Sequence, residues 1–436
     1  MSAIKPRERD ALFQALRAGV VPKLGLHHLQ VGRVAEITEL VGDMERLARG
    51  GTAMRFIVGD YGSGKTFFMN LIRLIALEKG MVCMFADLAP DRRLQSTGGQ
   101  ARALYAELAR NISTRTRPDG GALPAIVERF VSLSRQDAEQ QGVATDYIIR
   151  QKLAGFEEMT GGYDFAQVIR RYCEGHETGD DTLKAAALRW LRGEFPTKTD
   201  ARKALNVRTI VEDSSFYDQL KLMSAFVTAS GYKGLLVGLD EMVNLLRLAS
   251  AQSRAGNYEQ ILRILNDVLQ GSAENLGFLM GGTPEFLMNP RRGLYSYEAL
   301  QTRLAENTFA RNGLVDLSGP VIRLNSLTQE ELMILLQNIR RVLLADAALL
   351  PDAALEAFMV YCSSKIGDAY FRTPRNTITA FVNMIAVLQQ NPGTVWQDLL
   401  DGVELRTDSG DDLDLVDDLP AIDAAGPDDD LTSFKL

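Results

Sequence analysis

The chain has 436 residues, 46% of them apolar, so by length we expect roughly two or three domains around a sizeable core. No apolar run approaches the ~18–20 residues of a membrane span, which excludes a membrane-spanning helix, and the N-terminus lacks a signal-peptide pattern. The three cysteines and three histidines are scattered along the chain, which argues against a structural zinc site. The net charge of −8 comes from the last 36 residues, where twelve Asp or Glu against two basic residues give −10 and leave +2 for the first 400, so the acidic average does not exclude a nucleic-acid partner.

The N-terminal segment predicts an amphipathic helix over residues 8–20, with Leu12, Phe13, Leu16 and Val20 on one side. Gly32 and Arg33 then precede helical sequence over residues 34–47. A turn of this kind ahead of a phosphate loop commonly packs over the base of the nucleotide. It is equally compatible with a simple helix-entry turn, and both interpretations stay open.

A phosphate loop follows the apolar, strand-like run 54–58 and precedes a helix that starts near Lys65. Its residues match G-x-x-x-x-G-K-[ST] and are Gly59, Asp60, Tyr61, Gly62, Ser63, Gly64, Lys65 and Thr66. The glycines let backbone N–H groups turn around a phosphate, and the start of the helix attracts the same anion. Lys65 is predicted to reach the β- and γ-phosphates, and the Thr66 hydroxyl to bind Mg²⁺.

The next part of the chain predicts a strand and a long helical insertion. Residues 81–87 form a continuous apolar run, which suits a parallel strand buried on both faces. A helix over residues 97–112 follows, and then mostly helical sequence from about 113 to 230, whose last helix covers 216–229. Trp190 in this region is predicted to serve packing.

A second strand-like run ends in two carboxylates, Asp240 and Glu241. In a protein with a phosphate loop, the Asp at the strand end is expected to hold Mg²⁺ through its water shell. The Glu after it is expected to orient and deprotonate the attacking water. Helical sequence covers 241–271, with a polar loop predicted at 252–257.

Another buried strand is predicted to end at Thr283. If this strand lies between the two motif strands, Thr283 would face the γ-phosphate; otherwise it would cap the turn before Pro284. A fifth short strand is expected at 321–324, and Thr328 opens a capping box before the helix 332–344.

Helices are further expected at 352–364, 375–389 and 394–401, which together suggest a separate lid domain. Arg375 stands at a helix start from which it would reach back to the nucleotide. The Asp-rich segment from about 404 is predicted to be disordered, and its apolar end, residues 431–436, is either a docking peptide or part of a solubilising tail.

The order of these motifs resembles the AAA+ ATPases, and within them the initiator-like branch related to origin-recognition proteins, over roughly residues 20–400. The stretch LTQEELMILLQNI is similar to that branch. GVVPKLGLHHLQVGR, RFIVGDYGSGKTFF and GLLVGLDE more narrowly resemble the BrxD-like ATP-binding proteins of bacterial BREX phage-defence systems.

This resemblance implies roles for individual residues. Gly59 to Thr66 would be Walker A, and Asp240 with Glu241 would be Walker B. Thr283 would be the first sensor and Arg375 the second. Arg303 is the preferred arginine finger, acting on ATP bound to a neighbouring subunit, with Arg291, Arg292 and Arg311 as alternatives. The long helical insertion departs from common AAA+ modules, and no winged-helix DNA reader follows residue 402.

We therefore expect an α/β fold with a parallel five-stranded core, helices on both faces, a helical insertion and a C-terminal helical lid. The predicted divisions are an N-terminal segment (1–50), the ATPase core (51–325 with the insertion 113–230), the lid (326–403) and the tail (404–436).

The expected protein is a cytoplasmic ATPase that uses ATP and Mg²⁺ and assembles into a ring or filament. It is expected to bind double-stranded DNA without sequence specificity and to recruit or regulate protein partners, one of them on the C-terminal tail, in anti-phage defence. The main alternative is a STAND-like nucleotide-gated switch with little turnover. A small-molecule phosphotransferase fits less well, because the chain has an Asp-Glu pair rather than a mobile arginine lid.

Overall fold

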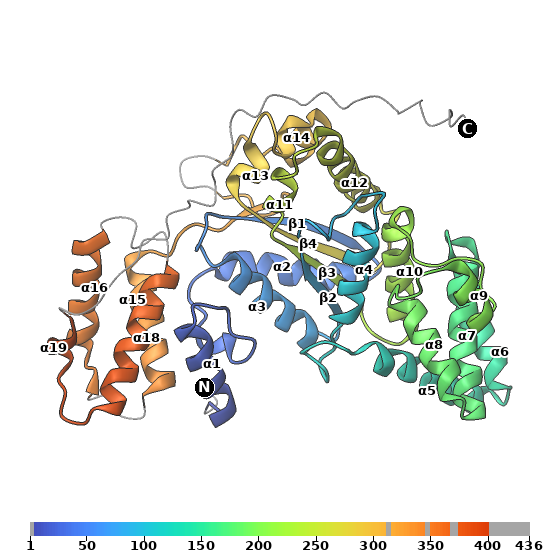
Figure 1. The fold of residues 1–436 in the computed structure, drawn as a ribbon, viewed down its shortest axis with the longest axis horizontal. Coiled ribbons are helices and arrows are strands. Elements are labelled where there is room, and N and C mark those ends of the chain that lie inside the picture. The colour runs from blue at the N-terminus through green and yellow to red at the C-terminus, as the bar shows by residue number, and fades with distance from the viewer. Residues whose placement is uncertain (1–3, 311–314, 345–348, 367–373, 401–436) are drawn as a thin grey trace, which may run out of the picture.

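The structure is a computed structural model that describes residues 4–310, 315–344, 349–366 and 374–400. Its centre is a sheet with helices on both sides, and two helical regions extend from opposite ends of it (Figure 1). The predicted acidic tail and its terminal docking peptide lie outside the described residues, and so does Arg311.

All five strands are parallel, in the order β2-β3-β4-β1-β5. They are rich in apolar side chains, and those of β1, β3 and β4 are buried throughout, as expected for a parallel sheet covered on both faces. The predicted α/β fold with a parallel five-stranded sheet is confirmed. The strands are β1 (Thr52–Val58), β2 (Val82–Asp87), β3 (Leu235–Asp240), β4 (Leu276–Gly282) and β5 (Val321–Arg323).

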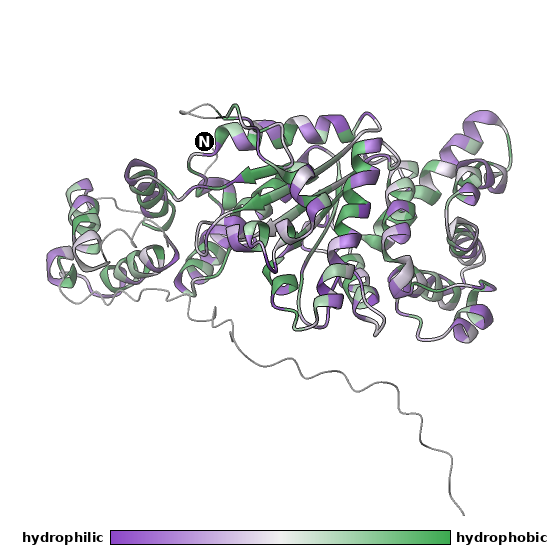
Figure 2. Cartoon of the chain, turned by 90° about the horizontal axis from the view of Figure 1, so that it is seen from above, coloured by the Kyte–Doolittle hydropathy of each residue, from purple (hydrophilic) through white to green (hydrophobic). Residues whose placement is uncertain are grey.

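Each face of the sheet has its own hydrophobic cluster, because successive side chains of a strand point to opposite faces. In β1, Ile57 packs on the face covered by α2 (Val34–Leu47) and α3 (Lys65–Glu78). Phe56 packs on the other face, below α4 (Gln100–Arg110), α10 (Phe216–Ala229) and α12 (Ala251–Gln270). Figure 2 shows the hydrophobic residues gathered on the strands and on the helix sides that face them.

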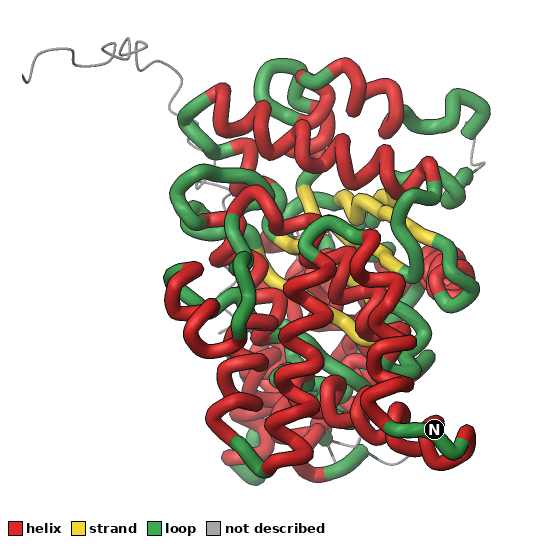
Figure 3. Tube along the Cα trace, turned by 90° about the vertical axis from the view of Figure 1, so that its right-hand side faces the viewer, coloured by secondary structure: helices red, strands yellow, loops and turns green. Residues whose placement is uncertain are grey.

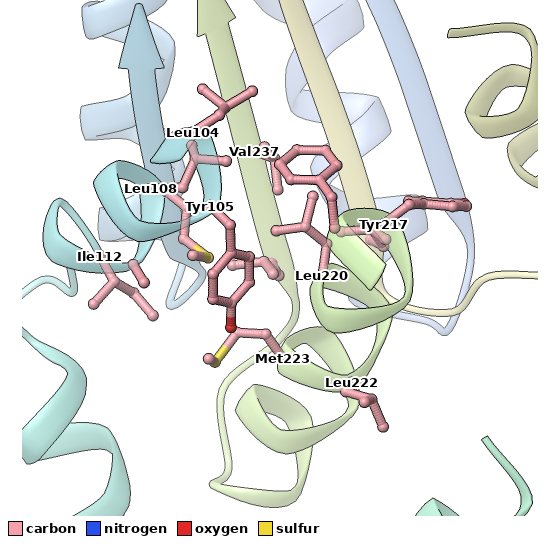
Figure 4. Packing of buried hydrophobic residues seen from close by; sticks show 14 of the residues in the cluster. Leu104, Tyr105, Leu108, Ile112, Tyr217, Leu220, Leu222, Met223 and Val237 are labelled. Carbon is pink, nitrogen blue, oxygen red and sulfur yellow. The ribbon is translucent and has the colours of Figure 1, made fainter. Parts of the chain in front are cut away.

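The helical insertion packs onto the hydrophobic cluster that contains Phe56. Phe130 of α5 and Phe165 of α7 both contact Phe226 of α10, with ring centroids 5.3 and 5.8 Å apart. Figure 4 shows the junction, where Tyr105 of α4 lies beside Met223 of α10. Trp190 is buried and donates its ring N–H to the Thr209 carbonyl (2.8 Å), so its predicted packing role is confirmed. The last helix of the insertion, α10, lies on the sheet, and the helices before it are α5 (Leu123–Gln141), α6 (Thr145–Leu153), α7 (Gly162–Thr178), α8 (Asp181–Leu191) and α9 (Lys198–Leu205).

A third cluster unites the N-terminal helix with the C-terminal helices. Leu12 and Leu16 of α1 (Pro6–Arg17) pack among apolar residues of α15 and α18, so the two ends of the described chain lie side by side (Figure 1). The proposed division at residues 50, 325 and 403 stays a prediction. The helices of this region are α15 (Gln329–Leu343), α16 (Asp352–Ile366), α18 (Pro374–Gln390) and α19 (Trp396–Leu400).

Two local predictions were wrong. Helix α1 ends at Arg17, and Val20 is 57% exposed instead of continuing the buried side, because a turn with Gly19 at φ 67° follows the helix. Residues 252–257 belong to the continuous helix α12, and the break lies before it, where Ser250 accepts a hydrogen bond from the Ser253 N–H (3.2 Å).

The loop predicted at 252–257 was inferred from polar residues, and one of them, Asn257, is buried. Asn257 accepts hydrogen bonds from the N–H groups of Leu94 and Gln95, both at 3.0 Å, and so fixes the loop after β2. The remaining short helices are α11 (Val243–Leu246), α13 (Pro284–Met288) and α14 (Glu298–Leu304).

Helices far outnumber strands around the core, and the sheet is enclosed between them (Figure 3). In the part of the chain that the structure describes, no helix is both long and apolar enough to cross a membrane.

Candidate functional site

The phosphate loop joins β1 to α3 at the carboxyl end of the sheet. Gly62 and Gly64 have φ of 75° and 85°, a region that favours glycine. A Cβ on Gly59 would lie 2.6 Å from the Ser63 hydroxyl and 2.9 Å from the Leu324 carbonyl, so a side chain there would displace the loop. The loop thus keeps its backbone free to surround an anion.

Lys65 is folded back onto this loop. Its Nζ donates to the carbonyls of Gly59 and Asp60, both at 2.8 Å, and lies 5.5 Å from the ring centre of Tyr61. Burial lowers the pKa of Lys65, while the nearby carboxylates of Asp240 and Glu241 oppose the shift. The ammonium group is therefore held at the loop by weak neutral acceptors, which an anionic phosphate would outcompete.

Thr66 and Asp240 meet although 174 residues separate them. The Thr66 hydroxyl donates to Oδ2 of Asp240 at 2.7 Å, because β3 ends next to the start of α3. Asp240 is only 8% exposed. A hydroxyl and a carboxylate oxygen side by side are the hard oxygen donors that Mg²⁺ prefers.

Glu241 follows Asp240 in an unusual backbone conformation, with φ of 57°. Its N–H donates to Oδ1 of Asp240 at 2.8 Å. Partial burial raises the pKa of the Glu241 carboxyl, and the negative charges of Asp240 and Asp87 raise it further. Both features suit a carboxylate that accepts a proton, since strain and raised pKa values of this kind concentrate at functional sites.

Thr283 lies at the end of β4, which is placed between β1 and β3. Its hydroxyl accepts a hydrogen bond from the Phe286 N–H (3.3 Å) and so caps α13, the simpler of the two predicted roles. Thr283 also lines the same cavity as Lys65 and Asp240. Its predicted contact with a γ-phosphate stays a prediction.

One cavity of about 200 Å³ joins these residues to an apolar end. The polar end contains Lys65, Thr66, Asp240 and Glu241. The apolar end is formed on one side by the N-terminal segment and on the other by α15 and α18; its apolar side chains are Val20, Val21, Pro22, Leu29, Val31, Leu335, Ile339 and Ile378. A charged end and an apolar end suit the phosphates and the base of a nucleotide.

The residues of α15 and α18 that line this apolar end were not predicted from the sequence. Leu335, Ile339 and Ile378 have the ordinary spacing of core residues on amphipathic helices, and no local signal separates them from the rest of that core. Arg375, which was predicted, does line the cavity at the start of α18. Its charge contributes to the lowered pKa of Lys65.

Arg33 contacts the loop and lines the cavity, whereas Gly32 does not line it. The Arg33 guanidinium donates to two backbone carbonyls, those of Ser63 and Asn325. The predicted contact with the base stays a prediction.

Three of the four candidate arginine fingers, Arg291, Arg292 and Arg303, lie within the described residues, and none of the three lines this cavity. Arg303 on α14 is exposed and donates to the Ala299 carbonyl of its own helix (2.9 Å). Arg291 is also exposed, while Arg292 is half-buried and donates to the Leu248 carbonyl (3.2 Å). Any role of Arg303 in catalysis would therefore require a second copy of the chain.

Within the described ranges, no three His, Cys, Asp or Glu residues gather as a metal site built by protein alone. Mg²⁺ at a nucleotide site needs only one or two protein oxygens, since phosphates and water supply the others. The Thr66 hydroxyl and the Asp240 carboxylate fit that requirement.

Comparison with protein-family models matches residues 4–404 to the family described as BREX system ATP-binding protein BrxC/D, and the chain belongs to this family. The family supports ATP as the nucleotide and the BREX defence system as the setting. No curated protein gave a significant match.

Proposed function

We propose that this member of the BrxC/BrxD family is a Mg²⁺-dependent ATPase of the AAA+ class. The observation that carries the proposal is the 2.7 Å hydrogen bond from Thr66 to Asp240, with Glu241 next in the chain and all three in the cavity of the phosphate loop. The parallel sheet, with β4 between β1 and β3, supports the same assignment.

In this proposal the N–H groups of the loop and the start of α3 bind the ATP phosphates, and Lys65 moves from the loop carbonyls onto the β- and γ-phosphates. Thr66 and Asp240 hold Mg²⁺, which when bound neutralises charge on the phosphate oxygens. Glu241 accepts a proton from the attacking water. The raised pKa of the Glu241 carboxyl and its position in the cavity support this role.

Thr283 and Arg375 are proposed to act on the γ-phosphate from opposite sides. Thr283 comes from the sheet and Arg375 from α18, so ATP would connect the core to the C-terminal helices. Hydrolysis would remove that connection.

The decisive test is Glu241→Gln. Turnover by the purified protein should fall by about 10²–10⁴-fold, while binding of ATP is retained, because the amide cannot accept the proton. Glu259→Gln changes an exposed glutamate of α12 outside the cavity and is the matched control. Undiminished turnover after Glu241→Gln would refute the assignment, and wild-type protein that holds ATP without turnover would favour a nucleotide-gated switch.

We further propose that active sites are shared between copies in a ring or filament, with Arg303 as the finger. Its exposure and its absence from the lining of its own chain's cavity support this. Arg303→Ala protein should bind ATP but lose turnover by about 10³-fold or more. Mixing it with Glu241→Gln protein should restore part of the activity, since each variant supplies what the other lacks. No recovery would move the role to Arg291, Arg292 or Arg311.

Double-stranded DNA, bound without sequence specificity, and protein partners of the BREX system complete the proposed function. The net charge of +2 on the first 400 residues is compatible with contacts to phosphates. DNA affinity should fall steeply as salt rises, because bound phosphates release counterions. Absence of binding at low salt with ATP present would refute the DNA partner.

A further inference from the structure

Arg33 joins two parts of the molecule that are distant in sequence. Its Nη2 lies 3.0 Å from the carbonyl oxygen of Ser63 in the phosphate loop and 2.9 Å from that of Asn325. Asn325 lies in the link between β5 and α15, the only connection from the sheet to α15 along the chain. A single guanidinium nitrogen therefore bridges the loop and this link.

The geometry of Arg33 is costly and would not be expected for a simple helix-entry residue. Arg33 has φ of 59°, a left-handed conformation that side-chain-bearing residues rarely adopt. Burial lowers the pKa of its guanidinium, while the carboxylates of Glu36 and Glu331 oppose the shift. The backbone conformation of Arg33 and the desolvation of its guanidinium are thus both unfavourable, and its two hydrogen bonds offset part of this cost.

Gly32 brings the same turn against the start of α15. A Cβ on Gly32 would lie 2.1 Å from Oε1 of Glu331. Glu331 is held in place by the capping box, in which it accepts from the Thr328 N–H (2.9 Å) and donates its own N–H to the Thr328 hydroxyl (3.2 Å). The turn therefore touches both the link and the first turn of α15.

The helix reached in this way is not an isolated element. Leu335 and Ile339 of α15 line the apolar end of the cavity, and α15 shares one hydrophobic cluster with α16 and α18. A change at the link would be transmitted to this whole helical region, because packed helices move together.

We propose that Arg33 is a positioning residue that couples the phosphate loop to the helical region α15–α19, so that ATP at the loop changes how firmly that region is held. The proposal rests on ATP binding at the phosphate loop, as set out above, but not on hydrolysis. Arg33 acts through the Ser63 and Asn325 carbonyls and not on the reacting atoms.

The test measures ATP binding and amide hydrogen exchange on the full chain in the Glu241→Gln background, so that hydrolysis plays no part. With Arg33 present, ATP should slow exchange both at 59–66 and at 325–343. With Arg33→Ala, saturating ATP should still protect 59–66 but should slow exchange at 325–343 clearly less than in the parent, since only direct contacts of ATP with the cavity lining remain, and ATP affinity should fall by about tenfold. Arg33→Lys should recover part of both effects, since one ammonium group reaches fewer acceptors at once.

Arg49→Ala is the matched control, because Arg49 is an exposed arginine just beyond the other end of α2. It should leave both measurements unchanged. If Arg33→Ala fails to fold, Gly32→Ala provides the second route: displacing Glu331 should likewise reduce the ATP effect at 325–343. ATP protection of both segments in the Arg33 or Gly32 variant, as in the parent, would overturn the proposal. Absence of turnover in the wild type would refute only the hydrolysis proposed above.

Discussion

Gly281→Ala should inactivate the site by displacing Asp240. Gly281 lies in β4 directly beside the carboxylate, and a Cβ built on it would be 2.3 Å from Asp240 Oδ1 and 2.6 Å from the Met69 sulfur. The methionine side chain is flexible and can move aside. Asp240 can move only by disrupting the hydrogen bonds that its two oxygens accept from the Thr66 hydroxyl and from the Glu241 N–H, at 2.7 and 2.8 Å.

The size of the effect follows from these distances. An ordinary carbon–oxygen contact is about 3.3 Å, so Asp240 Oδ1 must move by about 1 Å. Such a misplacement of a catalytic group costs about 10²-fold in rate. The extra methyl group in a packed sheet should also lower stability by about 1–3 kcal/mol.

Steady-state ATPase measurements with Mg²⁺, together with urea unfolding, check both values. ATP binding in the absence of Mg²⁺ should persist, because the phosphate loop itself is unchanged. Gly42→Ala is the matched control: Gly42 lies within α2, no atom is within 4 Å of its added Cβ, and the substitution should raise stability by about 0.5–1 kcal/mol. Turnover of Gly281→Ala within about threefold of wild type would refute the reasoning.

Three other substitutions test the surrounding structure. Asp43→Asn should destabilise the protein by about 3 kcal/mol, because buried Arg55 would lose the carboxylate that lies 2.6 Å from its Nε and 2.9 Å from its Nη2. A fall of less than ~1 kcal/mol in the free energy of unfolding, measured in urea, would contradict this. Burial opposes ionisation of Asp213, but hydrogen bonds from Ser96, Gly99 and Arg102 outweigh the effect of burial and lower the pKa of the carboxyl. The ionised carboxylate therefore stabilises the fold above the unfolded pKa near 4, and this stabilisation is lost as the pH falls through the lower folded pKa. Asp213→Asn should therefore cost about 1.5–3 kcal/mol at pH 7 and less below pH 3, and an equal loss at both pH values in urea unfolding would contradict this. Thr283→Ala should lower stability by about 1 kcal/mol, because the helix cap is lost. If turnover also falls and Thr283→Ser restores it, the hydroxyl acts on ATP as well. Unchanged turnover would show that the hydroxyl serves only as the cap.

The phosphate loop was predictable because its chemistry is local. Eight consecutive residues supply the glycines, the Lys65 ammonium and the Thr66 hydroxyl, and the flanking strand and helix follow from short-range patterns. The same holds for Asp240 and Glu241 at the end of a buried strand. The capping box of Thr328 and Glu331 was also read directly from residue spacing and is confirmed.

Local patterns failed where burial or distant contacts decide the outcome. The polar run 252–257 resembles a loop, but Asn257 is buried against the loop after β2, and α12 continues through it. Val20 continues a helical spacing, yet the chain turns before it and places it at the cavity. Hydrophobic periodicity describes a single element and contains no information on what that element meets.

The sequence by itself determined that the chain has a phosphate-loop motif, an Asp-Glu pair and the continuous apolar runs typical of parallel strands, since these depend on neighbouring residues. Only the tertiary structure decided that Thr66 meets Asp240, that Gly281 must lack a side chain, and that Arg33 bridges Ser63 and Asn325. Each of these is a contact between segments that only the strand order and the packing of helices bring together. The end of the cavity that contains Lys65, Thr66 and Asp240 could therefore be predicted from the sequence, whereas its connection to the C-terminal helices could not.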